Sequence, residues 1–149
     1  MSEEPGFIVK FYDKAYEKKD IIDLLNSPVD AISGVTRADA EKLEKAFNIK
    51  TVADLATNEY VRLAQAVTNF TECTGQILDK KFQSKEFIEL AEKPVNAING
   101  ISEGDAKLLK QALNIKSIKD LARNKYVNIA QTTISLAALL EVLVEMMES

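Results

Sequence analysis

The side chains that carry out most enzymatic chemistry are scarce in this chain. Among its 149 residues there is no His and a single Cys, Cys73. The absence of His excludes Ser-His-Asp and Cys-His triads and every His-ligated metal site. A single Cys excludes an internal disulfide, a CxxC redox pair and a four-Cys zinc site, and it suits the reducing cytosol. Catalysis would therefore have to rest on carboxylates.

The carboxylates are better explained as helix caps than as catalytic groups. Asp39, Asp54, Asp105 and Asp120 each follow a Thr or Ser by three positions, which is the capping-box pattern. No carboxylate run has EF-hand spacing, and the five Gly form neither a P-loop nor a GxGxxG fingerprint. We expect a non-enzymatic protein with no catalytic residue, no cofactor, no metal and no small-molecule substrate.

Composition places the chain among soluble globular proteins. It is 46% hydrophobic and 28% charged, with a net charge of −4. A dedicated nucleic-acid binder usually carries a strong positive balance. The N-terminus is acidic and lacks a basic start followed by an apolar stretch, so no signal peptide is predicted and we expect a cytoplasmic protein.

An internal repeat organises the sequence. Residues 94–133 align with 28–67 at an offset of 66 without a gap, and 20 of the 40 aligned positions are identical. This predicts an internal duplication. Two copies are too few for a solenoid, so a pseudo-twofold pair in one body is expected. The predicted divisions are an N-terminal extension at 1–17, a first repeat at 18–82 and a second repeat at 83–149.

Each repeat is predicted to be all-α because helix caps recur at equivalent positions. Thr36 and Ser102 begin helices of about twelve residues, and Asn48 and Asn114 occupy the place of a left-handed C-cap. Further helix starts are Thr51, Asn58, Ser117 and Asn124. The expected helices are 18–25, 36–47, 51–56 and 59–82, and then 85–92, 102–113, 117–122 and 125–147.

Three smaller features accompany these helices. Pro28 and Pro94 suit the first turn of a short helix, and a bend is expected near Gly75. Tyr60 and Tyr126, at equivalent positions, are expected to anchor the core. The segment FIVKFY, residues 7–12, is the one strand candidate, and it has no predicted partner.

The segments AISGVTRADAEKLEKAFNIKTVADLA (31–56) and AINGISEGDAKLLKQALNIKSIKDLA (97–122) resemble helix-hairpin-helix motifs. The ending NIKTVADLA is similar to the continuation found in such repeats of DNA ligases and of the RNA polymerase alpha C-terminal domain. The resemblance implies that hairpin N–H groups face a DNA phosphate, supported by a basic side chain. In this chain Thr36 and Ser102 replace the second hairpin glycine, and Ala38 and Gly104 replace the basic residue.

Charge makes the second hairpin the better nucleic-acid candidate. Residues 94–133 carry six basic and three acidic side chains, a net of +3, whereas the aligned residues 28–67 carry five basic and six acidic ones. The candidate residues for nucleic-acid binding are Gly100, Ile101, Ser102, Lys107, Lys110, Lys116, Lys119, Arg123 and Lys125.

The last predicted helix is apolar around most of its circumference between Ile134 and Met147. Such a helix needs neighbours on several sides, so it is either the centre of the monomer core or a site of self-association. Glu141 and Glu145 interrupt it, and it is predicted to be too short for a membrane span. The candidate interaction residues are Leu136, Leu139, Leu140, Leu143, Met146 and Met147.

The leading interpretation is thus an all-α binding module that interacts through its C-terminal helix with a protein partner or with itself, as a homodimer. The alternative is sequence-independent binding of DNA or RNA through the second hairpin. No membrane interaction is expected.

Overall fold

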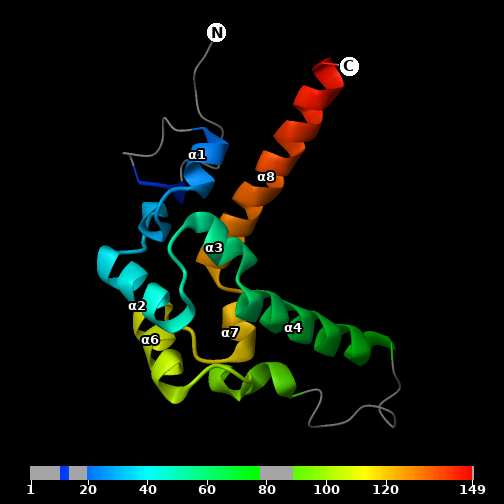
Figure 1. Ribbon diagram of the computed structural model, residues 1–149. Coiled ribbons are helices and arrows are strands. Elements are labelled where there is room, and N and C mark those ends of the chain that lie inside the picture. Colours follow the sequence, from blue (N-terminus) through cyan, green and yellow to red (C-terminus); the bar gives the residue numbers. More distant parts are fainter. Residues whose placement is uncertain (1–10, 14–19, 78–88, 149) are drawn as a thin grey trace.

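The computed structural model describes residues 11–13, 20–77 and 89–148 (Figure 1). Within these ranges the chain is helical, and the only extended pairing consists of isolated bridges, so the predicted all-α class is confirmed. The α-helices, numbered as in Figure 1, are α1 Ile21–Leu25, α2 Arg37–Phe47, α3 Val52–Thr57, α4 Glu59–Ile77, α6 Glu103–Leu113, α7 Ile118–Ala122 and α8 Lys125–Glu148. The 3-10 turns are η3 Val29–Ala31, η5 Leu90–Glu92 and η6 Val95–Ala97.

The predicted caps are all present. Thr36 Oγ1 accepts the Asp39 N–H at 3.0 Å, and the Asp39 carboxylate accepts the Thr36 N–H at 3.1 Å. The same reciprocal pair begins α3, α6 and α7. Asn48 and Asn114 end α2 and α6 with a φ of 57°. A cap of this kind contributes about 1 kcal/mol, so local sequence alone stabilises both ends of these short helices.

Some boundaries differ from the prediction. Asp20 caps α1, which begins at Ile21 and not at 18. The described part of the predicted helix 85–92 is only the turn η5. Pro28 and Pro94 precede their turns as N-caps with ψ near 150°, because their rings leave an extended entry into η3 and η6.

Three other predictions fall partly outside the described residues. The helix of α4 continues through Gly75, and residues 78–82 lie outside the described ranges. So do residues 7–10 of the strand candidate, whose Tyr12 forms one bridge with Ile32. Both predicted boundaries between the divisions, at 17/18 and 82/83, also lie there.

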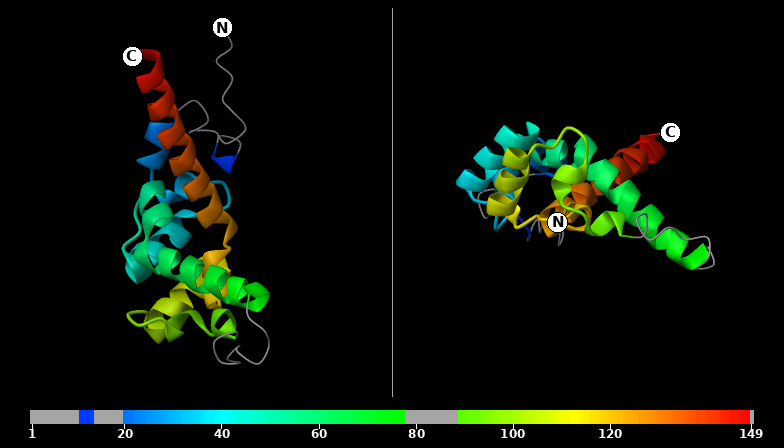
Figure 2. Two further views of the ribbon diagram at one scale, coloured as in Figure 1. Left: turned by 90° about the vertical axis from the view of Figure 1, so that its right-hand side faces the viewer. Right: turned by 90° about the horizontal axis from the view of Figure 1, so that it is seen from below.

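The two repeats pack in a reciprocal, pseudo-twofold manner. Helix α2 lies against α6, while α3 packs on α8 and α7 packs on α4 (Figures 1 and 2). The elements that precede the aligned segments 28–67 and 94–133 also contact the other repeat, since α1 contacts α8 and η5 contacts α4. One continuous core therefore draws buried side chains from both repeats.

Two glutamines at equivalent positions join the repeats. The Gln65 amide donates to Gln131 Oε1 at 2.7 Å, and the Gln131 amide donates to Gln65 Oε1 at 2.9 Å. Gln65 Nε2 also donates to the Ala122 carbonyl, and Gln131 Nε2 to the Ala56 carbonyl. Each glutamine therefore satisfies a carbonyl at the end of the other repeat's short helix.

Tyr12, which lies in the predicted N-terminal extension, belongs to this core. Tyr12 is 2% exposed and shares a 2.9 Å hydrogen bond with Thr133 of α8. The Asp13 N–H donates to the Ala31 carbonyl, and the Ser33 N–H donates to the Phe11 carbonyl. The N-terminal segment thus ties the turn η3 to the last helix.

Candidate interaction surfaces

Each hairpin glycine lies at a packing contact between the two repeats. Gly34 and Gly100 have φ angles of 97° and 101°. A Cβ at Gly34 would lie 2.6 Å from Tyr126 Oη, and one at Gly100 would lie 2.7 Å from Tyr60 Oη. The predicted packing of both tyrosines against the core is confirmed. Each tyrosine in addition places its hydroxyl over the hairpin glycine of the other repeat.

Carboxylates occupy the helix starts where a phosphate would bind. At the second hairpin the Asp105 carboxylate accepts the Ser102 N–H at 3.2 Å. At the start of α7 the Asp120 carboxylate accepts the N–H groups of Lys116 and Ser117, at 3.0 and 3.1 Å. A negative side chain at a helix N-terminus already balances the helix dipole and repels a second anion. These starts are therefore poorer anion sites than an uncapped hairpin.

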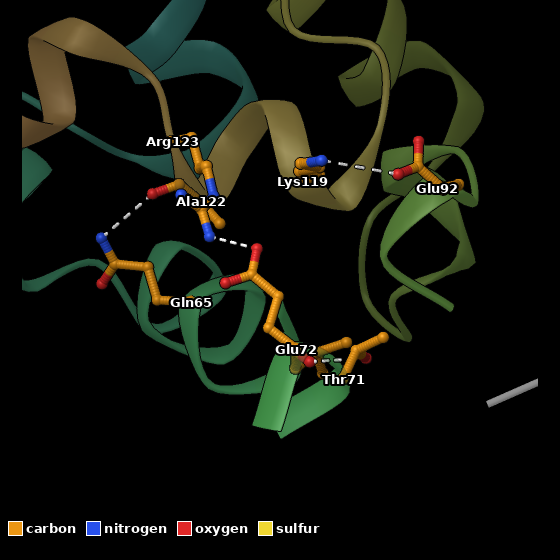
Figure 3. Close-up of polar contacts among 8 residues, drawn as sticks. Gln65, Thr71, Glu72, Glu92, Lys119, Ala122 and Arg123 are labelled. Atoms are coloured by element: carbon orange, nitrogen blue, oxygen red, sulfur yellow. Dashed lines mark hydrogen bonds and ion pairs between the residues drawn. The ribbon is translucent and has the colours of Figure 1, made fainter. Parts of the chain in front are cut away.

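Several of the predicted nucleic-acid residues are engaged in packing, capping or ion pairs within the fold. Ile101 is buried at 5% exposure, and Ser102 is engaged in its capping box. Lys119 lies 3.8 Å from Glu92 of η5, and Arg123 is ion-paired with Glu72 of α4 (Figure 3). Both cations therefore face carboxylates that come from outside their own hairpin.

Two of the predicted lysines line a common cleft. Lys110 and Lys125 border an open cleft of 540 Å³ between the end of α6 and the start of α8. Lys125 Nζ lies 5.1 Å from the centre of the Tyr126 ring, a cation–π contact. Lys107 and Lys116 are exposed on the surface outside this cleft.

The last helix is divided into a buried half and an exposed half. Val127, Ala130, Thr133 and Ala137 pack into the core. Every residue from 138 to 148 is exposed, and the end of α8 leaves the body of the molecule with α1 alongside it (Figures 1 and 2). The first half of the helix lies in the monomer core, which is one of the two predicted alternatives, and the second half is exposed. Self-association, the other alternative, stays a prediction.

The exposed half of α8 carries two different faces. Leu136, Leu139, Leu143 and Met146 follow one another at spacings of three, four and three residues, and we call them the outer stripe. At about 100° per residue they lie on the side of the helix opposite Ala137, which is buried. Within the stripe, Leu136 is half-buried, whereas the exposed fractions of Leu139, Leu143 and Met146 are 53%, 44% and 66%.

The inner face of α8 forms a groove with α1 that the sequence did not predict. Its lining joins residues more than a hundred positions apart, such as Ile22 and Val144. The groove has a volume of 460 Å³. Its lining residues are Asp20, Ile21, Ile22, Ala137, Leu140, Glu141, Val144 and Glu145, and we call it the α1–α8 groove.

The fold agrees with a comparison against known protein families. Residues 27–75 match the family of SAM-like helix-hairpin-helix tandems. This part of the chain is therefore similar to helix-hairpin-helix tandems. The match lies within the first repeat, and the second repeat has the equivalent caps and helices. Helix-hairpin-helix domains often bind nucleic acids or proteins. No curated protein and no solved structure matches the chain.

Two further tests concern metals and membranes. In the part of the chain that the structure describes, no group of three or more acidic or Cys side chains could hold a metal ion. The stretch Ile118–Glu148 is long and apolar enough to cross a membrane, judged by length and composition alone. The prediction that the last helix is too short to cross a membrane does not hold by that measure.

Proposed function

We propose that this helix-hairpin-helix protein is a cytoplasmic, non-enzymatic interaction module that self-associates through the exposed half of α8. The observation that carries the proposal is a run of eleven exposed residues in which seven are large and apolar. Apolar surface of this extent on one projecting helix is typical of an interaction site. The seven residues are Leu139, Leu140, Val142, Leu143, Val144, Met146 and Met147.

The spacing of the outer stripe favours a second helix as the partner. Leu136, Leu139, Leu143 and Met146 occupy the a and d positions of two heptads, the pattern by which two helices pack side by side. The twelve residues 136–147 give a seam about 18 Å long. A second copy presents an identical seam, so two copies can bury both stripes at once through a symmetric contact.

A membrane explains the same apolar residues less well. The exposed residues 138–148 extend only about 16 Å, about half of the hydrocarbon thickness of a bilayer. Spanning a bilayer would require Val127 and Ala130, both 0% exposed, to leave the core. From residue 126 to 148 the helix contains no Lys or Arg that could attract anionic lipid headgroups.

The oligomeric mass of variants tests the proposal. We expect the wild-type protein to have at least twice the monomer mass of 16.5 kDa in light scattering after size exclusion, and Leu143→Glu to be a monomer. The reason is that the substitution places a charge in the middle of the apolar seam.

The matched control is Leu63→Glu on α4, because Leu63 is 47% exposed and Leu143 is 44% exposed. This variant should keep the wild-type mass. Circular dichroism verifies that all variants remain folded. A wild-type protein that is monomeric at high concentration, or a folded Leu143→Glu variant with unchanged mass, would show that α8 is not the association site.

Nucleic-acid binding through the second hairpin is the alternative function, supported by the family and by the net charge of +3 in residues 94–133. The capping carboxylates and the ion pairs of Lys119 and Arg123 weigh against it. We expect no binding of labelled duplex or single-stranded DNA or RNA in fluorescence anisotropy at about 50 mM salt.

The opposite result would be recognisable by its salt dependence. Phosphate binding would weaken steeply between about 50 and 200 mM salt, because bound phosphates release their counterions. It should also disappear when Lys107→Glu and Lys110→Glu are combined. Both lysines are exposed, so this pair of substitutions tests binding without disturbing the core. Such a result would make the hairpin, and not α8, the functional site.

A further inference from the structure

The α1–α8 groove combines an apolar floor with a rim of one charge. Ile22, Leu140 and Val144 are 53%, 46% and 50% exposed, so they retain much of their contact with water. The carboxylates of Asp20, Glu141 and Glu145 border the groove, and none of the described residues that line it is a cation. The groove therefore offers apolar contact and a concentrated negative charge at the same place.

The shape and charge of the groove define the chemistry of a partner. The segment from Ala137 to Val144 extends about 10 Å, the length of two helical turns, and α1 forms the opposite wall. An amphipathic helix laid into such a groove contributes apolar residues at i, i+3 or i+4, and i+7. Lys or Arg beside those positions would meet the carboxylate rim, and opposite charge guides and orients association.

We propose that the α1–α8 groove binds a basic amphipathic helix of a partner protein. This inference is independent of self-association, because the groove lies on the inner face of α8, whereas the outer stripe lies on its opposite face.

Charge also separates this partner from other occupants. The groove of a second copy brings the same three carboxylates, so two grooves placed face to face repel one another. An anionic bilayer would meet the same repulsion. A helix with Lys or Arg at its rim positions is the occupant that complements Asp20, Glu141 and Glu145.

A model peptide of Leu and Lys at helical spacing serves as the probe, and the same peptide with Glu in place of Lys serves as its counterpart. In fluorescence anisotropy at low salt we expect the full-length protein to bind the Lys peptide and not the Glu peptide. Combining Glu141→Lys with Glu145→Lys should weaken binding by about tenfold or more, because the rim then repels the peptide. Ile22→Ser should also weaken it, through the apolar floor.

The control combines Glu41→Lys with Glu44→Lys on α2, which changes the net charge equally at two exposed positions outside the groove. This variant should bind the peptide like the wild type. Equal weakening by both pairs would overturn the proposal, because binding would then follow net charge alone. Failure of the Lys peptide to bind the wild type at low salt would overturn it as well.

The two proposals fail separately. Leu143→Glu changes the outer stripe and should leave affinity for the peptide unchanged, whereas the change at Glu141 and Glu145 should leave the oligomeric mass unchanged. A monomeric wild-type protein that binds the peptide would support the groove proposal and refute self-association. An oligomeric protein that does not bind the peptide would support self-association and refute the groove proposal.

Discussion

Replacing Gly34 with alanine is expected to lower the free energy of unfolding by about 2–4 kcal/mol. Two costs combine at this position. The φ angle of 97° is strained for any residue with a Cβ, and that Cβ would lie 2.6 Å from the Tyr126 hydroxyl oxygen. Urea denaturation followed by circular dichroism measures the change. Gly100, under Tyr60 of the first repeat, should respond in the same way.

Gly104 supplies a control of opposite sign. It lies inside α6, and its nearest neighbour to an added Cβ is Ser102 Oγ at 3.7 Å. Gly104→Ala should therefore raise the free energy of unfolding by about 0.5–1 kcal/mol, the usual gain for alanine in a helix. A destabilisation of Gly34→Ala no larger than a few tenths of a kcal/mol would contradict the close contact that the structure shows.

A second substitution separates the two costs at Gly34. In Gly34→Ala combined with Tyr126→Phe the hydroxyl is gone, and the nearest remaining ring carbon is Cε1, 3.1 Å from the added Cβ. The double variant should therefore recover part of the loss, and the strain of the φ angle should remain. A double-mutant cycle gives the coupling between the two residues. Recovery would identify the hairpin glycine as the docking point of the other repeat.

The local structure of this protein is predictable from its sequence because short-range chemistry determines it. A hydroxyl and a carboxylate three residues apart are sufficient for each capping box, as at Thr36 and Asp39. The left-handed ends at Asn48 and Asn114 are equally local. What a single repeat cannot predict is which surfaces of the two repeats meet. Gln65 and Gln131 stand out as identical in the aligned repeats, but their mutual hydrogen bonds depend on the pseudo-twofold axis.

The candidate sites were harder to predict for the same reason. The positive balance of residues 94–133 was visible in the sequence, but Glu72 and Glu92, which pair with Arg123 and Lys119, belong to α4 and η5. The groove beside α1 likewise requires Ile22 and Val144 to meet. The apolar pattern of the last helix does not predict where its buried half ends. Both halves are apolar, and only tertiary packing distinguishes the buried half from the exposed half.

Replacing Tyr12 with alanine is expected to lower the free energy of unfolding by about 3–5 kcal/mol, the usual range for truncating a buried aromatic residue. Tyr12 is 2% exposed and packs between the first repeat and α8. Tyr12→Phe should cost only about 0.5–1.5 kcal/mol, because it removes one hydrogen bond. The Thr133 hydroxyl keeps its 2.8 Å bond to the Ile129 carbonyl and is not left without a partner. Similar losses in both variants would contradict the packing role.

The same residue should make stability depend on alkaline pH. Burial raises the pKa of Tyr12 above its ordinary value of 10.0, and the hydrogen bond with Thr133 offsets this only in part. The folded protein therefore favours the neutral phenol. Its contribution to stability is complete below pH 10.0, where the unfolded chain is also neutral, and is lost as the pH rises through the folded-state pKa. Because lysines also titrate there, the informative quantity is the difference between the wild type and Tyr12→Phe, which should narrow above pH 10.0. A constant difference across that range would mean that the Tyr12 phenol ionises as readily in the folded protein as in the unfolded chain.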